Sequence, residues 1–217
     1  MKKGLFITFE GPDGSGKTTQ IKRLANFLQQ EQIPFIITRE PGGTRISDLI
    51  RGILLNPEHQ EMKNQTEVLL YAASRAQHIH EKIIPAIEEG IIVLCDRFVD
   101  ASIAYQGYGL GIDIETIEQI NRFATSHLEP DRTYLFDLAP EEGRKRMLLR
   151  LGEQVTNLDR IEQKTLEYHK RVREGFHALG EKHKQRMTVV DGAQTIDAIS
   201  EQIKQDFCEL LKTCECE

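Results

Sequence analysis

A glycine-rich run near the N-terminus, GPDGSGKT at residues 11–18, most constrains what this chain can fold into. A short apolar segment, residues 5–9, precedes it, and a segment with apolar residues at helical spacing follows it. Strand, glycine-rich turn and helix in this order form the context in which the pattern G-x4-G-K-[ST], the P-loop, binds phosphate. Glycine lets the backbone curl so that successive N–H groups point at phosphate oxygens, and the helix N-terminus adds its positive dipole end. A glycine-rich turn that binds nothing is the alternative, and the matching context disfavours it.

The P-loop predicts an ATP-binding site with a magnesium ion beside it. The Lys17 ammonium can reach the β- and γ-phosphates, and the Thr18 hydroxyl can hold Mg²⁺. Asp96 follows an apolar run, where P-loop folds hold a second carboxylate near Mg²⁺, although a helix N-cap aspartate would look the same. The expected ATP-binding residues are Gly11, Pro12, Asp13, Gly14, Ser15, Gly16, Lys17, Thr18 and Thr19.

Short apolar runs alternate with helical patterns along the whole chain. Strands are expected at 5–9, 35–38, 91–95, 133–138 and 188–191. Helices are expected at 46–54, 66–89 with a break near Pro85, 115–125, from 140, 160–184 and 196–211, and the run 106–111 is too glycine-rich for regular structure. This alternation predicts an α/β fold, a P-loop NTPase three-layer sandwich with a five-stranded parallel sheet covered by helices on both faces.

No linker, repeat or low-complexity segment divides the chain, so residues 1–217 are expected to form a single domain. Arginines and a glycine lie around a polar gap at residues 151–157. Such a composition suggests a small mobile lid over phosphates near residues 144–160. An ordinary loop beside a solvated helix face is the alternative.

Composition excludes several classes of protein. The net charge of −6 gives no overall basic field for a nucleic acid, and no apolar run approaches the roughly 20 residues that span a bilayer. The apolar segment after the basic N-terminus is too short for a signal peptide, so a cytoplasmic location is expected. Cys95 is expected to be a buried thiol. Three further cysteines are interpreted as reduced thiols in a frayed tail rather than as metal ligands, namely Cys208, Cys214 and Cys216.

Four arginines follow predicted strands, namely Arg39, Arg51, Arg75 and Arg97. Several cations around one site suggest a second anionic ligand, because a P-loop alone does not require them. The residues therefore favour a phosphotransferase that acts on a phosphorylated acceptor. From its spacing alone, Arg75 fits a solvated surface charge as well as a ligand clamp. The Asn-Lys-x-Asp motif of GTPases and the Leu-Ser-Gly-Gly-Gln signature of ABC-type ATPases are both absent from the sequence.

Several runs resemble the thymidylate kinase family, in the same order along the chain. The most specific is DRFVDASIAYQG at residues 96–107, and the others are the P-loop, TREPGGT at 38–44, YAASR at 71–75 and LDRIE at 158–162. The resemblance implies transfer of the γ-phosphoryl group of ATP to dTMP, with Mg²⁺, for dTTP synthesis. It also implies a cytoplasmic homodimer, in which the helix at 66–89 and its neighbours are the expected dimer face.

The resemblance also carries roles for the dTMP site. Tyr71 would stack on the thymine ring, because an aromatic ring offers a flat apolar surface. Arg75 and Gln106 would hydrogen-bond the base edge, where the neutral amide can both donate and accept. The other implied contacts are Ser102 near the 5-methyl group, Tyr105 at the 2′ position, Asp13 at the 3′-hydroxyl, and Arg39, Arg51 and Arg97 at the phosphate.

Catalysis is expected to consist of positioning and charge neutralisation. The expected catalytic residues are Lys17, Asp96, Arg97 and an arginine of the lid, because Gly14 stands where some family members carry an arginine in the P-loop. Arg150 is the favoured lid arginine, with Arg146 and Arg144 as the others. A kinase for another nucleoside monophosphate or a deoxynucleoside is the alternative enzyme, and a P-loop regulator without phosphotransfer is the alternative from another class.

Overall fold

The computed structural model of the chain describes residues 3–151 and 158–215, without the side chains of 150, 151, 214 and 215. Its centre is a five-stranded sheet in the order β2-β3-β1-β4-β5, and every pairing is parallel. The strands are β1 (Phe6–Glu10), β2 (Phe35–Arg39), β3 (Ile92–Asp96), β4 (Arg132–Asp137) and β5 (Met187–Asp191). The predicted sheet is therefore confirmed.

Strand register brings the polar strand ends to one edge of the sheet. Phe9 of β1 and Arg39 of β2 are both register partners of Asp96 of β3, although all three are far apart in the sequence. Because all strands run in the same direction, the P-loop after β1 and the loops after β2 and β3 leave the sheet together. Ligands of open α/β sheets bind at this carboxyl edge.

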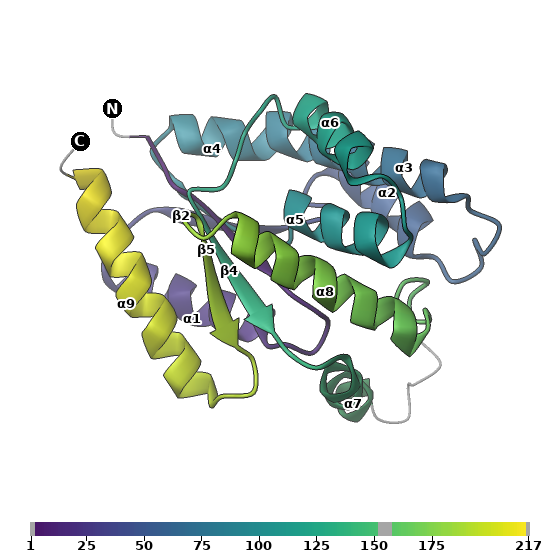
Figure 1. Cartoon of the computed structure of the whole chain (residues 1–217). Coiled ribbons are helices and arrows are strands. Elements are labelled where there is room, and N and C mark those ends of the chain that lie inside the picture. The colour runs from purple at the N-terminus through teal and green to yellow at the C-terminus, as the bar shows by residue number, and fades with distance from the viewer. Residues whose placement is uncertain (1–2, 152–157, 216–217) are drawn as a thin grey trace.

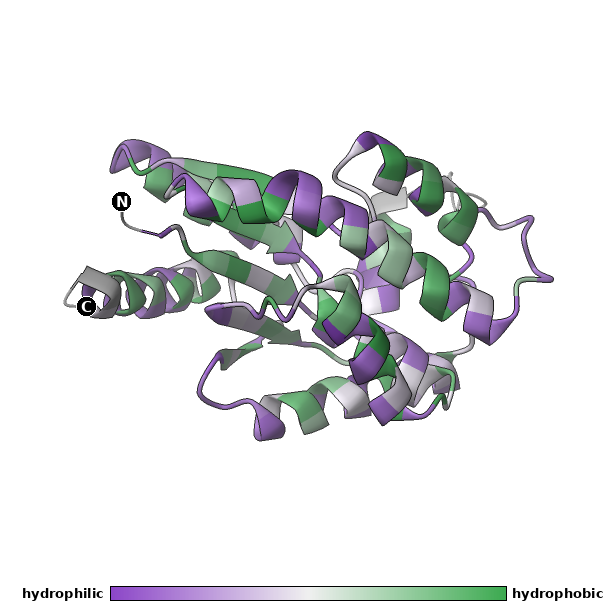
Figure 2. Ribbon diagram, turned by 90° about the horizontal axis from the view of Figure 1, so that it is seen from above, coloured by the Kyte–Doolittle hydropathy of each residue, from purple (hydrophilic) through white to green (hydrophobic). Residues whose placement is uncertain are grey.

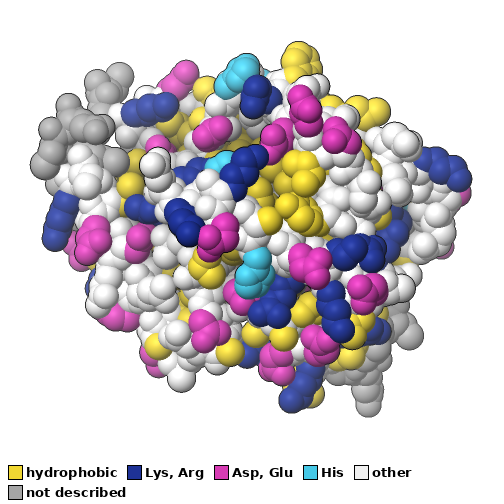
Figure 3. Space-filling model, in the orientation of Figure 1, with side chains coloured by type: hydrophobic (Ala, Val, Ile, Leu, Met, Phe, Trp, Pro, Cys, Tyr) yellow, Lys and Arg dark blue, Asp and Glu magenta, His cyan; other side chains and the backbone are white. Residues whose placement is uncertain are grey.

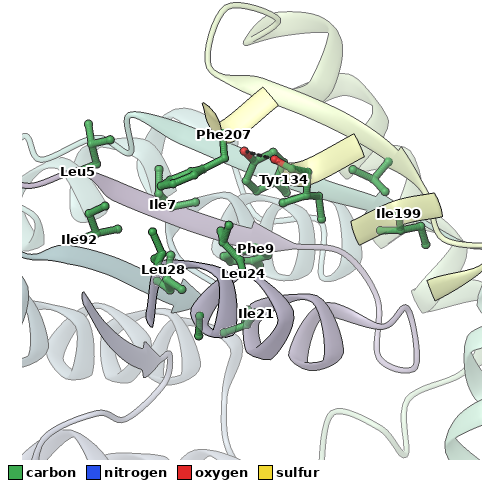
Figure 4. Close-up of a cluster of buried hydrophobic side chains, with 14 of the residues drawn as sticks. Leu5, Ile7, Phe9, Ile21, Leu24, Leu28, Ile92, Tyr134, Ile199 and Phe207 are labelled. Atoms are coloured by element: carbon green, nitrogen blue, oxygen red, sulfur yellow. Dashed lines mark hydrogen bonds between the residues drawn. The ribbon is translucent and has the colours of Figure 1, made fainter. Parts of the chain in front are cut away.

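One face of the sheet is covered by α1 (Lys17–Gln30) and α9 (Ile196–Glu215), as Figure 1 shows. Figure 4 shows their apolar side chains meeting those of β1 and β4, with Phe207 of α9 beside Tyr134. Both of these rings are completely buried. Full burial of a large apolar side chain contributes about 1.5–3 kcal/mol, so this core fixes α1, and the P-loop before it, against the sheet.

The other face is covered by helices that lie between the strands in the sequence (Figure 1). They are α3 (Asn64–His78), the π-helix η1 (Ile79–Ile83), α4 (Ile84–Glu88), α5 (Val99–Ser102), the π-helix η2 (Ile103–Gly109), α6 (Ile114–Ala124) and α8 (Leu166–Lys182). Figure 2 shows the hydrophobic strands enclosed between helices that carry hydrophilic residues on their outer sides. The remaining helices are α2 (Arg45–Leu55) and α7 (Pro140–Leu151).

The expected helix at 66–89 is present as α3, η1 and α4 in succession, and the break expected near Pro85 is confirmed, since Pro85 lies at the start of α4. Two other predictions about helices need correction. The glycine-rich run at 106–111 was expected to lack regular structure, but it is mostly helical, because η2 extends to Gly109. Glycine serves packing here: a Cβ at Gly109 would come within 2.6 Å of the Tyr168 ring, so glycine lets η2 and α8 approach closely. The helix expected from residue 160 begins at Leu166 instead, since Arg160 lies buried in a turn before it.

The apolar face of α2 is largely exposed. Ile46, Leu49 and Ile53 are between 42% and 62% exposed, and Leu54 is the apolar side chain of α2 that is buried. Helical spacing alone predicts inward-facing side chains for Leu69 of α3 and Phe123 of α6, and both predictions are wrong, since both side chains are exposed. The helical spacing was predicted correctly, but it does not distinguish a core face from a face that meets another chain.

No helix in the described part of the chain is long and apolar enough to cross a membrane. On the face drawn in Figure 3, basic and acidic side chains are interspersed. Cys95 is buried as expected, and Cys208 is half-buried with a free thiol. The side chain of Cys214 and the whole of Cys216 lie outside the described residues.

Candidate active site

The P-loop leaves β1 and curls through three glycines with positive φ. Gly11, Gly14 and Gly16 have φ of 128°, 77° and 96°, a region that glycine adopts without steric cost. A Cβ on Gly14 would come within 2.4 Å of the Gly143 carbonyl oxygen, so this glycine also permits close contact with α7. The backbone geometry of the predicted phosphate-binding turn is thus one that requires glycine at these three positions.

Lys17, the first residue of α1, folds back over the loop. Its Nζ donates to the carbonyl oxygens of Gly11 at 3.0 Å and Pro12 at 2.8 Å. Burial, together with the positive charge of Arg97, lowers the pKa of Lys17 to about 8. An ammonium with a lowered pKa gains from an anionic ligand, because the added negative charge stabilises its protonated form.

Thr18 and Asp96 meet as the sequence predicted, with the Thr18 hydroxyl donating to Oδ2 of Asp96 at 3.2 Å. A hydroxyl and a carboxylate at this separation suit Mg²⁺, which takes one or two protein oxygens and completes its octahedron with phosphates and water. The described residues contain no cluster of three or more His, Cys, Asp or Glu side chains that would form an all-protein metal site. The donor set therefore fits a cation held jointly with a phosphorylated ligand.

A cavity of about 400 Å³ opens around these groups, and we call it the P-loop cavity. Its lining is polar and combines residues of the P-loop, α1, the ends of β2 and β3, α2, α7 and the segment after residue 157. Its lining residues are Asp13, Gly14, Gly16, Lys17, Thr18, Thr19, Arg39, Glu40, Arg51, Asp96, Arg97, Arg146, Met147, Asp159 and Glu162. Of the expected ATP-binding residues, Gly11, Pro12 and Ser15 do not line it.

A second, narrower cavity of about 100 Å³ adjoins the first, and we call it the tyrosine cavity. It is lined by Asp13, Glu40, Pro41, Arg51, Leu55, Tyr71, Arg75, Arg97, Phe98, Ala101, Ser102, Tyr105, Gln106, Asp159 and Ile161. Every residue expected to bind the acceptor lines it except Arg39, which lines the P-loop cavity. The two cavities share Asp13, Glu40, Arg51, Arg97 and Asp159.

Arg97 stands at the junction of the two cavities. Its Nη2 donates to Oδ1 of Asp13 at 2.9 Å, and its guanidinium lies 5.0 Å from the centre of the Tyr105 ring. Partial burial opposes ionisation of Asp13, whose side chain is 40% exposed, but the charges of Arg97 and Lys17 outweigh it and lower the pKa of Asp13 to about 2. The other terminal nitrogen of Arg97, Nη1, is buried without a partner among the described residues. Arg97 is therefore held in place with donors left for an anion.

Arg75 is a buried clamp and not a solvated surface charge, since its side chain is 2% exposed. Its Nε donates to Oε2 of Glu40 at 2.6 Å, and Nη2 donates to the Phe98 carbonyl oxygen at 3.0 Å. Its Nη1 donates to the Ser102 hydroxyl at 3.0 Å and to the Asn121 side-chain oxygen. A guanidinium has five N–H donors, so one N–H on Nη2 remains for the tyrosine cavity.

Glu40 connects this clamp to the sheet edge. Its second oxygen, Oε1, meets Nδ1 of His78 at 3.1 Å, and Nε2 of the same ring lies 2.6 Å from the Thr38 hydroxyl. His78 is completely buried. The chain from Thr38 to Arg75 therefore positions the arginine through buried partners on β2 and α3.

Tyr71, Ser102 and Tyr105 lie together around the narrow cavity as expected. Burial raises the pKa of Tyr71 and of Tyr105 above the ordinary range, so both phenols stay neutral. The Tyr105 hydroxyl is buried and has no hydrogen-bond partner in the described part of the chain. A buried polar group without a partner costs free energy, which a ligand oxygen at this place would recover.

The outer arginines differ in how firmly they are held. Arg51 Nη1 donates to the Pro41 carbonyl oxygen at 2.8 Å, and burial together with the charge of Arg39 lowers its pKa. Arg39 pairs with Asp48 at 3.2 Å, and both side chains are about half exposed. An anion would relieve the repulsion between the guanidinium groups of Arg39 and Arg51, so these two arginines suit a phosphate.

The lid arginines are only partly described. Arg146 lines the P-loop cavity, where Nε pairs with Glu142 at 2.9 Å and Nη1 donates to the Gly192 carbonyl oxygen at 2.9 Å. Arg144 lies near the P-loop in a small depression beside Asp13. The side chain of Arg150 lies outside the described residues, as does the part of the expected lid at 152–157.

Several residues of the site were not singled out from the sequence. Asp159 lines both cavities, and Arg160 pairs with Glu67 at 2.7 Å behind them. Asp159 and Arg160 belong to the LDRIE run, but reading Arg160 as the start of a charged helix concealed its burial. No local pattern distinguishes Glu67 from the many charged residues on helix surfaces.

Comparisons with known proteins agree with this geometry. A family profile described as thymidylate kinase matches residues 9–203. The chain is 53% identical over 212 residues to a thymidylate kinase of Exiguobacterium sibiricum, covering 98% of each chain. It is 48% identical to one from a Geobacillus species, covering 91% of this chain and 92% of that protein. The crystal structure of thymidylate kinase from Ehrlichia chaffeensis superposes with a TM-score of 0.74 at 32% identity, covering 94% of this chain and 99% of the other. With its P-loop, its two joined cavities and this similarity over nearly the full length, the chain belongs to the thymidylate kinase family.

Proposed function

We propose that this chain transfers the γ-phosphoryl group of ATP to the phosphate of dTMP, giving dTDP and ADP. The observation that carries the proposal is the junction of the two cavities at Arg97 and Asp13. One cavity is lined by P-loop residues and the other by tyrosines and buried polar groups. A phosphate at the junction could therefore face both a nucleotide base on one side and a P-loop phosphate on the other.

The acceptor is proposed to bind with its base in the tyrosine cavity. Tyr71 would stack on the thymine ring, and Arg75 and Gln106 would hydrogen-bond the base edge. The remaining contacts are Ser102 near the 5-methyl group, Tyr105 at the 2′ position, Asp13 at the 3′-hydroxyl, and Arg39, Arg51 and Arg97 at the phosphate. The unpartnered Tyr105 hydroxyl and Nη1 of Arg97 support this arrangement, since both lie at this cavity with donors to spare.

The donor ATP is proposed to bind along the P-loop, residues 11–19. Lys17 would leave the carbonyl oxygens of the loop and neutralise the β- and γ-phosphates. Thr18 and Asp96 would hold Mg²⁺, which neutralises phosphate charge and orients the phosphate chain when bound. The bond from γ-phosphorus to the bridging oxygen breaks as an acceptor phosphate oxygen bonds to phosphorus. The acceptor oxygen is already ionised, so no strong general base is needed.

We also propose that residues 144–160 act as a lid of the single domain and bring an arginine to the transferred group. Arg146 already lines the P-loop cavity, while Arg150 is the candidate that the sequence favours. Separate Arg146→Ala and Arg150→Ala variants test the assignment by single-turnover kinetics. The variant that lowers the rate of the chemical step by about 10³-fold or more identifies the acting arginine. A loss below tenfold in both variants would leave Arg144, and a loss below tenfold in Arg144→Ala as well would contradict a lid arginine.

The function is tested by ADP release from Mg²⁺-ATP with a panel of acceptors. We expect strong dependence on dTMP, a weaker response to dUMP, and none to thymidine. Release with a different nucleoside monophosphate would retain a P-loop kinase but reject the thymine site. Phosphorylation of thymidine would indicate a deoxynucleoside kinase, and ATP binding without any acceptor-dependent release would indicate a regulator.

The exposed apolar side chains support a homodimer, in line with the dimer face expected near residues 66–89. Ile46, Leu49 and Ile53 lie on α2, which packs against α3, where Leu69 is exposed. Exposed large apolar side chains on two helices that pack together are typical of a protein interface. Sedimentation of the wild-type chain and of Leu49→Asp should give a dimer and a monomer, respectively. We expect Leu149→Asp, which changes a leucine exposed on α7, to leave the dimer intact.

We also propose that the protein is located in the cytoplasm.

A further inference from the structure

A buried ion pair lies behind the tyrosine cavity without lining it. Glu67, in the first turn of α3, is 1% exposed. Its Oε2 accepts from Nη1 of Arg160 at 2.7 Å, and its Oε1 accepts from Nε2 of Gln106 at 3.0 Å. Gln106 does line the cavity, so one buried carboxylate holds a side chain that reaches it.

This contact determines which way the Gln106 amide faces. An ionised carboxylate only accepts hydrogen bonds, so the amide must turn its NH₂ group toward Glu67. The opposite orientation would bring the Gln106 carbonyl oxygen against Oε1 of Glu67, two acceptors at hydrogen-bond distance. Oε1 of Gln106 accepts no hydrogen bond from the described residues and is not among their enclosed polar atoms, so it is open to the cavity.

Glu67 cannot easily move away, because Arg160 is anchored on the end of α2. Nε of Arg160 donates to the Leu54 carbonyl oxygen at 2.8 Å, and its backbone N–H donates to that of Leu55 at 3.1 Å. The Arg160 side chain is 4% exposed. A charge pair buried and hydrogen-bonded in this way is rigid, since breaking it leaves an uncompensated charge in the interior.

We propose that Glu67 is a positioning residue that sets the pyrimidine specificity of the site by fixing the direction of the Gln106 amide. The inference rests on the proposed function. The lining of the cavity then includes an acceptor, the Gln106 carbonyl oxygen, and a donor, the last N–H of Arg75. Thymine offers a donor at N3 and an acceptor at O4, which match this pattern. Cytosine offers an acceptor at N3 and a donor amino group at C4, so each of its groups would meet a group of its own kind.

The test is the Glu67→Gln variant, whose side chain has the same shape but can also donate. Gln106 is then free to take either orientation and to pair with cytosine. We measure kcat/KM of the variant and the wild type for dTMP, dUMP and dCMP. The ratio of dTMP to dCMP should fall by about tenfold, the effect of one mispaired buried hydrogen bond. The ratio of dTMP to dUMP should change by less than twofold, because uracil has the same N3–H and O4.

Glu81→Gln is the matched control, because Glu81 also accepts a glutamine Nε2, that of Gln77 at 2.6 Å, but is exposed and lines neither cavity. It should leave both ratios unchanged. If Glu67→Gln does not fold, the double variant Glu67→Gln/Arg160→Met removes the unpaired charge and is assayed in the same way. Unchanged ratios, or equal changes in both ratios, would overturn the inference while leaving the proposed function intact. A wild-type enzyme without dTMP-dependent ADP release would overturn both.

Discussion

Replacing Arg97 by alanine removes the group that joins the two cavities. Arg97 has a φ of 70°, which costs alanine as much as arginine, so the backbone should be unaffected by the change. What is lost is Nη1, buried and unpartnered, with two N–H donors for the acceptor phosphate. A hydrogen bond to a charged group contributes about 1.5–3 kcal/mol, so two contribute about 3–6 kcal/mol. Since 1.4 kcal/mol is about tenfold, kcat/KM for dTMP should fall by about two to four orders of magnitude.

The assay is coupled ADP release with dTMP varied at saturating Mg²⁺-ATP. Asp13 loses its partner in this variant, but its side chain is 40% exposed and can be hydrated, so folding should be retained. Arg97→Lys keeps the charge without the planar fork and should fall between the wild type and the alanine variant. Arg23→Ala is the control, because it breaks an arginine–aspartate pair of 2.6 Å between α1 and α9, away from both cavities. A loss of less than tenfold in Arg97→Ala, or an equal loss in Arg23→Ala, would refute the assignment.

Three further predictions concern the P-loop and the strand before it. Lys17→Ala should abolish turnover. Because the pKa of Lys17 is about 8, kcat/KM for ATP in the wild type should decline above that pH, as the free enzyme loses this charge. A flat pH profile up to pH 9 would contradict this role of Lys17. Burial, with the nearby charge of Asp100, raises the pKa of Glu10 from 4.5 to about 8, so the folded chain retains a proton that the unfolded chain releases, and stability should fall as the pH rises from 5 to 8. Glu10→Gln keeps the acceptor for the Phe98 N–H and lacks this titration, so its Tm should exceed that of the wild type by a margin that grows toward pH 8; a constant margin would argue against it. Gly14→Ala should lower both Tm and activity, because φ is 77° and the new Cβ meets backbone. Gly52→Ala on α2 meets nothing within 4 Å, so it should leave activity unchanged and should not lower Tm, since alanine favours a helix interior over glycine.

The sheet and the phosphate site could be predicted because their signals are local. Glycines at positive φ, a lysine and a threonine at fixed spacing form the P-loop within a few residues, and apolar runs of strand length mark the sheet. The carboxyl edge of a parallel sheet then brings Arg39, Asp96 and the P-loop together, whatever the details of packing. The residues proposed for the thymine site were implied by the resemblance of specific runs to the family, and they line one cavity in the structure.

The helices were harder to predict, because periodicity reports an apolar face but not what covers it. Ile46, Leu49 and Ile53 have the spacing of a core face and are exposed. Arg160 was expected at the start of a charged helix, yet it is buried against the carboxylate of Glu67, which lies far away in the sequence. Its partner, Glu67, has no sequence neighbour that indicates burial.

The sequence by itself determined the order of strands and helices, the phosphate-binding turn and the arginines that a second anion requires. Only the tertiary structure decided which of these charges are held and by what. Arg75 could have been a surface charge until Glu40, Asn121 and the Phe98 carbonyl oxygen enclosed it. The physical reason is that backbone conformation depends on near neighbours, whereas the orientation of a buried polar side chain depends on partners that only folding brings within hydrogen-bond distance.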